Sequence, residues 1–172
     1  MTDPGALPAI VEEAMKKAAI AWVSAAGGPA TAVWCLPLDG VLYLVTGPGE
    51  QSVAGLAAGV PAEVTLRGDH GGRIVSWIAD VTAVAPGSEL WEQVAPALAG
   101  KRLNAVGDAA GVARRWADAC VVWGLTPVGA PTEAGGSLPS GAQAEPVRPS
   151  AATRLARAPF RLHKVRQPKK LS

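Results

Sequence analysis

The residue types that carry acid–base and nucleophilic chemistry are scarce in this chain. It has two histidines, His70 and His163, and two cysteines, Cys35 and Cys120. His70 follows Asp69 in a glycine-rich loop, where a solvated side chain is the ordinary interpretation, and a triad would need a partner that only the fold could supply. Neither cysteine has a second Cys or His at the spacing of a metal site. We therefore assign no catalytic residue and predict no metal centre.

One segment has the composition of an anion-binding turn. Gly47-Pro48-Gly49 follows a strand-like run that ends in Thr46, and Glu50–Ala58 is predicted as a short helix. The start of a helix exposes backbone N–H groups that bind phosphate, and Gln51 and Ser52 would add side-chain hydrogen bonds. The alternative, which stays open, is that Gly-Pro-Gly only turns the chain. A full dinucleotide pattern is missing because Ser52 stands where its third glycine would be, and the P-loop lysine is absent.

The first half of the chain contains the elements that would position this turn. Residues 8–18 predict an amphipathic helix. Asp39-Gly40 between two apolar runs is a signal for a two-residue β-hairpin. Because short turns join antiparallel strands only, we expect a meander of the three predicted strands, Ala19–Ala25, Ala30–Pro37 and Val41–Thr46.

The second half adds three strands and two helices. Strands are predicted at Ala62–Arg67, at Arg73–Val84 and at Cys120–Thr126, where Pro127 ends the last one. Both faces of Arg73–Val84 are partly apolar, so one is expected in the barrel interior and the other against a partner subunit. The helices are a Ser88-capped one to about Ala99, which Pro96 kinks or splits, and an Asp108-capped one over Ala109–Ala119.

Charge divides the chain into two segments. Residues 1–147 hold eight basic and fourteen acidic residues, a net charge of −6, whereas residues 148–172 hold eight basic residues and no acid. We predict one domain over residues 1–127, followed by a Pro/Gly/Ala-rich linker and a basic disordered tail over 128–172. The tail would contact nucleic acid or another acidic partner, fold back on the acidic domain, or stay solvated without a partner.

The composition also bears on location. We find no secretory signal and no apolar stretch as long as a membrane span. The two thiols are expected to be buried and reduced. A cytoplasmic protein without membrane contact is therefore the prediction.

The order of the elements resembles that of a known family. The segments that carry the resemblance are Ala21-Trp22-Val23-Ser24, Thr31-Ala32-Val33-Trp34, Asp39-Gly40-Val41-Leu42-Tyr43-Leu44-Val45-Thr46-Gly47 and Glu50–Leu56. Together with the long fifth strand and the helices before a closing strand, they resemble the pyridoxamine 5′-phosphate oxidase-like family of split-barrel flavin-binding proteins. The resemblance covers about residues 8–127 and consists of many weak matches.

The resemblance implies a mainly β fold, a six-stranded antiparallel split β-barrel that forms a homodimer. It also implies a small-molecule cofactor at the dimer interface, namely FMN, a deazaflavin coenzyme or haem. The phosphate would lie at Thr46, Gly47, Gly49, Gln51 and Ser52. The second strand, with Thr31, Val33 and Trp34, would run along the isoalloxazine ring.

The sequence departs from the family pattern at the phosphate. Flavin-binding members usually place Arg or Lys after the third strand, where this chain has Gln51 and Ser52. A phosphate without a cation loses the stronger charge-assisted hydrogen bonds. Arg67 on the fourth strand is the candidate substitute, and a plain surface residue is its other interpretation.

Two functions follow from this sequence. The leading hypothesis is a flavin- or deazaflavin-dependent oxidoreductase in which the cofactor supplies hydride transfer and the protein supplies binding and orientation. The alternative is a cofactor-free dimeric barrel, a structural or interaction module whose basic tail contacts an acidic partner. The substrate does not follow from the sequence.

Overall fold

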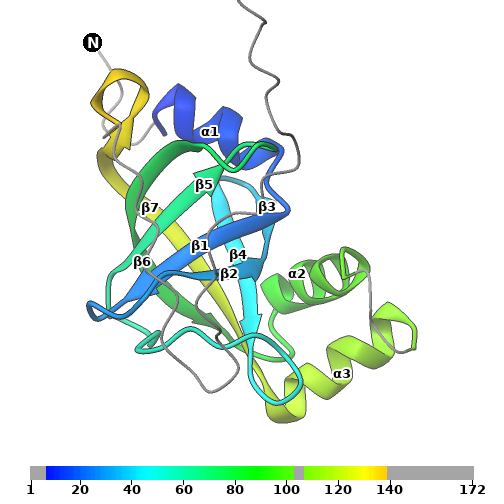
Figure 1. Cartoon of the computed structure of the whole chain (residues 1–172). Coiled ribbons are helices and arrows are strands. Elements are labelled where there is room, and N and C mark those ends of the chain that lie inside the picture. Colours follow the sequence, from blue (N-terminus) through cyan, green and yellow to red (C-terminus); the bar gives the residue numbers. More distant parts are fainter. Residues whose placement is uncertain (1–6, 103–106, 139–172) are drawn as a thin grey trace, which may run out of the picture. The chain divides into compact units, whose positions relative to one another are not determined.

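Seven antiparallel strands form one sheet in the order β2-β1-β5-β6-β7-β4-β3 (Figure 1). The computed structural model describes residues 7–102 and 107–138, all within one unit of the chain, Met1–Pro139. The strands are β1 (Ile20–Ala25), β2 (Thr31–Trp34), β3 (Leu36–Leu38), β4 (Val41–Thr46), β5 (Ala62–Arg67), β6 (Arg73–Val84) and β7 (Val121–Ala134). Of the predicted linker and tail over 128–172, residues 139–172 lie outside the described residues.

The two edges of the sheet are neighbours in the sequence. β2 pairs with β1 at one edge and β3 pairs with β4 at the other, yet Cys35 alone separates β2 from β3. Because adjacent Cα atoms lie about 3.8 Å apart, the sheet must curl until its edges approach each other. The prediction of one strand over Ala30–Pro37 was therefore wrong, and the sheet has seven strands where six were predicted.

The hairpin between β3 and β4 is confirmed. Asp39 and Gly40 both have positive φ angles, 48° and 76°. A type I′ turn needs this backbone conformation at both central residues, and it matches the twist of the paired strands. The turn sets the register in which Leu38 faces Val41.

The last strand is twice as long as predicted. Pro127 lies inside β7 opposite Ala79, and Val128 pairs with Ile78. Pairing resumes after an irregularity, where Glu133 faces Ser76 and Ala134 faces Val75. The prediction that Pro127 ends this strand was wrong because a proline removes only one N–H donor, and the residues after it still pair with the long strand β6.

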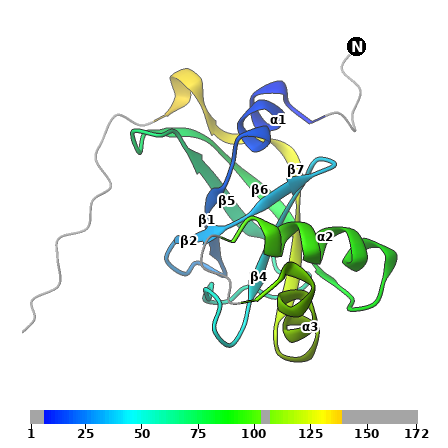
Figure 2. The same ribbon diagram turned by 90° about the vertical axis from the view of Figure 1, so that its right-hand side faces the viewer.

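Helices lie at two places around the sheet. Figures 1 and 2 show α1 (Ala9–Lys16) at one end of the barrel and the pair α2 (Glu89–Gly100) and α3 (Ala109–Ala119) on another side. The predicted caps are present, since Ser88 Oγ accepts from Trp91 N–H and Asp108 Oδ1 accepts from Gly111 N–H. Pro96 does not split α2. None of the helices in the described part of the chain is long and apolar enough to cross a membrane.

Strand β4 contributes to two apolar cores. Its burial runs over four consecutive residues, and successive side chains of a strand point to opposite faces. Leu42 and Leu44 belong to the barrel core, which also holds Trp77 from β6. Tyr43 and Val45 belong to a second core beneath α2 and α3, around Trp91 and Trp116. The helix pair is thereby fixed on the outer surface of the barrel next to the end of β4.

The segment after β4 contains no helix, so the prediction for Glu50–Ala58 was wrong. Gly55, inside the predicted helix, has φ of +74°, a conformation incompatible with a right-handed helix, and Gly49 and Gly59 on either side of the segment have φ of +78° and +77°. A Cβ at Gly55 would lie 2.8 Å from the Cβ of Ala26, so chain packing also requires glycine there. The segment is an irregular connection between β4 and β5.

Candidate functional site

The turn after β4 is held against helix α3. A Cβ at Gly47 would lie 2.8 Å from both Cα and Sγ of Cys120, and φ at Gly47 is +142°. Thr46 accepts a 2.8 Å hydrogen bond at Oγ1 from the indole N–H of Trp123. The predicted residues Thr46 and Gly47 therefore make contacts within the chain that position the turn.

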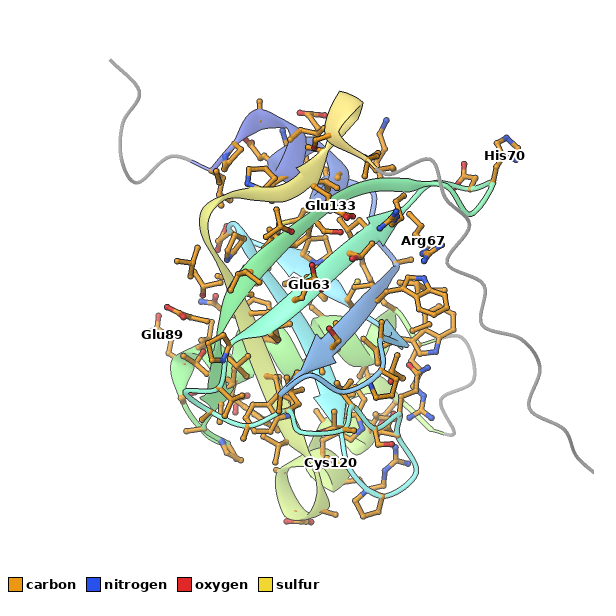
Figure 3. All side chains as sticks on the ribbon, turned by 60° about the vertical axis from the view of Figure 1, so that its left-hand side comes forward. Glu63, Arg67, His70, Glu89, Cys120 and Glu133 are labelled. Atoms are coloured by element: carbon orange, nitrogen blue, oxygen red, sulfur yellow. The ribbon has the colours of Figure 1, made fainter. Side chains whose placement is uncertain are left out.

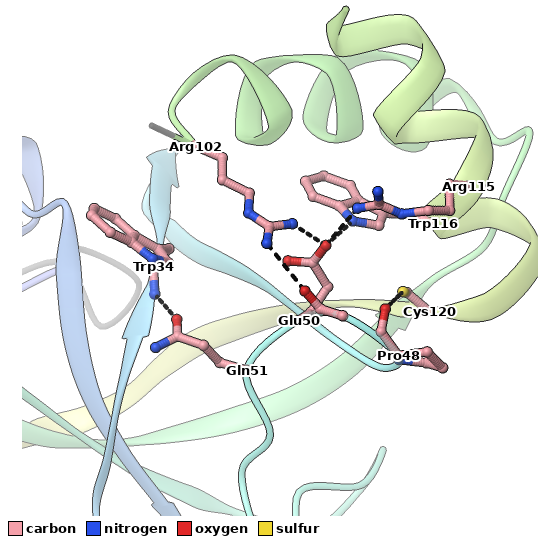
Figure 4. A network of polar contacts seen from close by, with 9 residues as sticks. Trp34, Pro48, Glu50, Gln51, Arg102, Arg115, Trp116 and Cys120 are labelled. Atoms are coloured by element: carbon pink, nitrogen blue, oxygen red, sulfur yellow. Dashed lines mark hydrogen bonds and ion pairs between the residues drawn. The ribbon is translucent and has the colours of Figure 1, made fainter. Parts of the chain in front are cut away.

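Glu50 is the centre of a network that the sequence did not indicate (Figure 4). Its Oε1 accepts hydrogen bonds from Arg115 Nη2 and from Trp116 Nε1, each at 2.8 Å, and from Arg102 Nη1. Arg102 Nη2 also donates to the carbonyl oxygen of Gly49 at 3.1 Å. The side chain of Glu50 is 5% exposed, against 23% for Arg102 and 47% for Arg115. Two cations thus converge on the predicted phosphate turn, and a carboxylate of the chain is bound to both.

Gln51, the next residue, binds the free edge of β2. Its Oε1 accepts from the backbone N–H of Trp34 at 2.8 Å, and its Nε2 donates to the carbonyl oxygen of Ala32 at 2.7 Å. Edge strands present unpaired backbone groups of this kind. Gln51 satisfies two of them in the strand that the family resemblance places along a flavin ring.

The space between these groups is small. Trp34, Glu50, Gln51, Arg102 and Trp116 line a cavity of about 10 Å³. A cavity of that size holds roughly one water molecule. A phosphate therefore enters only if Glu50 leaves its present position, and a ring reaches the edge of β2 only if Gln51 does.

The remaining predicted cofactor-binding residues, Val33, Thr31 and Ser52, differ in how exposed they are. Val33 is 1% exposed and part of the barrel core, so only its backbone is available to a ligand. Thr31 is partly exposed near the start of β2, and Ser52 is exposed next to Gln51. Neither adds a cation to the turn.

Arg67 belongs to a different place. Its guanidinium lies 4.9 Å from the ring centroid of Trp22, and Nη1 donates to the carbonyl oxygen of Gly71 at 3.1 Å. Both residues line a groove of about 720 Å³ between α1, β1 and the β5–β6 turn. Figure 3 shows Arg67 far from Cys120, which marks the Gly47 turn. Arg67 therefore lies away from that turn, whereas Arg102 and Arg115 lie next to it.

The two cysteines are poor nucleophiles in this fold. Burial raises the pKa of Cys35 to about 12. Burial first, and then the charge of Glu50, also raise the pKa of Cys120. A raised pKa keeps a thiol protonated, and the thiolate is the reactive form. Within residues 7–102 and 107–138, His, Cys, Asp and Glu side chains do not gather in groups of three that could hold a metal ion.

Sequence reasoning missed Arg102 and Arg115 because nothing local connects them to the turn. They are 52 and 65 positions from Glu50. The available signal was the i,i+4 spacing of Val112 and Trp116 on α3, which are both buried and put Arg115 at the margin of a buried face.

The comparisons with known proteins bear on the fold. The sequence matches no family model and no curated protein. Among solved structures, the chain is similar to HutZ, the heme storage protein from Vibrio cholerae, with a TM-score of 0.52 and 14% identity over 70% of this chain and 89% of that chain. A candidate general stress protein 26 from Jannaschia sp. CCS1 gives a TM-score of 0.45 and 16% identity over 69% of this chain and 71% of that one.

We draw no conclusion from the second of these, whose TM-score lies below 0.5. At 14% identity the first shows a shared fold and nothing finer. With the sheet order, it confirms the predicted fold class, which is mainly β with peripheral helices. The antiparallel sheet forms a half-barrel, and the described part of the chain has three α-helices around it.

Proposed function

We propose that this chain is a member of the pyridoxamine 5′-phosphate oxidase-like split-barrel family and binds a planar cofactor with an anionic group. The observation that carries the proposal is the convergence of Arg102 and Arg115 on the turn after β4. These arginines supply the cations that the sequence lacks at Gln51 and Ser52. The fold shared with HutZ supports the same family.

The groups at the turn suit a phosphate or carboxylate in charge and in hydrogen bonding. Guanidinium groups form strong charge-assisted hydrogen bonds with both anions. The indole N–H of Trp116 adds a neutral donor. Glu50 now occupies these donors, so the cofactor binds in exchange for its carboxylate.

FMN and a deazaflavin coenzyme are the first candidates, and a bound flavin would supply hydride transfer to or from a small substrate. The chain would bind the phosphate through Arg102 and Arg115 and would place Trp34 and the edge of β2 beside the ring. Haem is the other candidate, because HutZ is a heme storage protein and haem is also planar with anionic groups.

The outer face of the sheet supports a homodimer. Four apolar side chains on this face are between 37% and 46% exposed, namely Ile20, Ile74, Ile78 and Val128. Ile78 and Val128 are cross-strand partners, so the apolar surface is continuous from β6 to β7. A pair of exposed apolar side chains on a sheet face suits contact with a second copy of the chain.

Light scattering after size-exclusion chromatography tests the dimer. We expect twice the monomer mass for the natural chain and the monomer mass for Ile78→Lys. Glu92→Lys, an exposed change on α2, is the control and should remain dimeric. A monomeric natural chain overturns the dimer.

Absorbance spectra and titrations test the cofactor. The purified chain is titrated with FMN, with a deazaflavin and with haem, and micromolar binding of one of them is expected. Arg102→Ala and Arg115→Ala should weaken that binding about tenfold or more, as expected for the loss of a hydrogen bond to a charged group. Arg114→Ala, which removes the neighbouring charge on α3, is the matched control. Absence of binding to all three cofactors overturns the proposal.

One observation favours a second function: Glu50 and Gln51 already satisfy the groups that a cofactor would use. It is the cofactor-free barrel, an interaction module whose basic residues 148–172 contact an acidic partner. Because β7 runs to Ala134, the informative deletion is 139–172. Loss of partner binding on deletion, with no cofactor bound by the full chain, would favour this module.

A further inference from the structure

We propose that Glu50 and Gln51 are a built-in occupant of the cofactor site, which holds the place of a ligand and limits its affinity. The Glu50 carboxylate would stand for the anionic group and the Gln51 amide for the polar edge of a planar ring. The inference rests on the proposed function for the identity of the ligand, but its test has a separate readout.

The Glu50 half of the occupant rests on its three donors. Arg102, Arg115 and Trp116 all donate to one oxygen, Oε1, of a side chain that is 5% exposed. A phosphate oxygen accepts the same donors with the same geometry. The two arginines and one carboxylate leave a net charge of +1, which becomes +2 once the carboxylate is removed. The cluster therefore favours an anion, and Glu50 is the anion it has.

The Gln51 half rests on a two-point contact with β2. One acceptor and one donor of the amide meet the N–H of Trp34 and the carbonyl oxygen of Ala32 at 2.8 Å and 2.7 Å. A ring that carries adjacent carbonyl and N–H groups, as the pyrimidine edge of a flavin does, presents the same pair. Gln51 thus satisfies the strand edge that a flavin would otherwise bind.

The position of these residues in the fold permits the exchange. Glu50 and Gln51 lie in the irregular connection between β4 and β5, so their displacement breaks no strand ladder and no helix. The cavity of about 10 Å³ between them is too small for a ligand unless they move. The apparent affinity of the natural chain is then reduced by the fraction of molecules in which the site is open.

The test compares FMN with riboflavin, which lacks the phosphate. Flavin fluorescence titrations are made with the natural chain, Glu50→Gln, Gln51→Ala and the exposed control Glu63→Gln. Glu50→Gln should bind FMN about tenfold or more tightly, the lower end of what one charge-assisted hydrogen bond contributes, and riboflavin with little change. Gln51→Ala should raise the affinity for both flavins by the same factor. Glu63→Gln should leave both affinities unchanged.

A second readout uses inorganic pyrophosphate and no flavin. Pyrophosphate should raise the melting temperature of Glu50→Gln and leave that of Glu63→Gln unchanged, because a ligand stabilises the folded state that it binds. If Glu50→Gln does not fold, Gln51→Ala keeps every ion pair of the cluster and carries the test. Unchanged affinity for flavins in both variants, with no effect of pyrophosphate, overturns the inference.

The outcomes separate this inference from the proposed function. Micromolar FMN binding by the natural chain with no gain in either variant would retain the proposed function and overturn the built-in occupant. Flavin binding by Glu50→Gln alone would support the occupant and would overturn flavin binding by the natural chain. If none of these proteins binds a flavin and pyrophosphate has no effect, the inference is overturned, and the proposed function is overturned as well if haem does not bind.

Discussion

Replacing Gly47 by alanine distinguishes a packing role of this glycine from a ligand-binding role. An added Cβ would lie 2.8 Å from Cys120 Cα and Sγ and 3.0 Å from the carbonyl oxygen of Ala119, and φ is +142°. Backbone strain of this type costs about 1–3 kcal/mol. Overpacking adds about 1–3 kcal/mol, so Gly47→Ala should lower the free energy of unfolding by roughly 2–6 kcal/mol.

Gly49→Ala is the matched control for this prediction. Gly49 has φ of +78°, but a Cβ added there would meet no atom within 4 Å, so only the left-handed backbone contributes, about 1–2 kcal/mol. Urea denaturation followed by tryptophan fluorescence gives both values from the midpoints if the slope is unchanged. Equal stability of Gly47→Ala and Gly49→Ala would refute the packing role. Weaker FMN binding at unchanged stability would instead identify Gly47 as a ligand residue.

Three further predictions concern other parts of the fold. Folding raises the pKa of Cys35 from 9.0 to about 12, so above pH 9 only the unfolded state loses the thiol proton. The free energy of unfolding should therefore be unaffected by Cys35 below pH 9 and fall above it by up to about 1.4 kcal/mol per pH unit. Urea denaturation should show this fall for the natural chain and less of it for Cys35→Ala. Thr46→Val leaves the partly buried N–H of Trp123 without its acceptor and should lower the free energy of unfolding by about 1–3 kcal/mol. In a Trp123→Phe background the same change should lower it much less, which a double-mutant cycle measures. In urea denaturation, deletion of 128–172 should lower the free energy of unfolding by roughly 2–4 kcal/mol more than deletion of 139–172 does. The longer deletion removes the end of β7 and several ladder hydrogen bonds, each worth about 0.5–1.5 kcal/mol.

Elements with a local cause were predictable from the sequence. Ser88 and Asp108 are caps whose side chains act within three residues, and both helices begin where predicted. Asp39-Gly40 is a turn whose conformation depends on its own two residues. The strand Arg73–Val84 was predicted with its observed bounds because alternation over twelve residues leaves one apolar face continuous.

Elements decided by distant contacts were not predictable. The segment Glu50–Ala58 has a helical pattern but forms no helix. Gly55 has a positive φ angle, and the side chain of Gln51 is bound to β2. β7 continues past Pro127 because β6 offers a partner, which the composition of residues 128–138 does not reveal. The break at Cys35 follows from barrel closure, a property of the whole sheet.

The same distinction explains the candidate site. The anion-binding role of the turn after β4 stays a prediction, and the sequence offered Arg67 as a candidate cation or as a plain surface residue. Arg67 stacks on Trp22 in another groove, whereas the two arginines at the turn come from the segment just after α2 and from α3. The core that these helices share with Tyr43 and Val45 of β4 holds them next to the turn.

The network at the turn requires an anion whichever function is correct. Trp116 is fully buried between the helices and the sheet, and its N–H shares an acceptor with Arg102 and Arg115. Partly buried guanidinium groups that lose their counter-charge are costly, so a bare site is disfavoured. A ligand can displace Glu50 only by bringing its own negative charge, which riboflavin lacks and FMN has. Under the proposed function, a charged cofactor should therefore bind more tightly than a neutral one, and its anionic group must replace the carboxylate of Glu50 at Arg102 and Arg115.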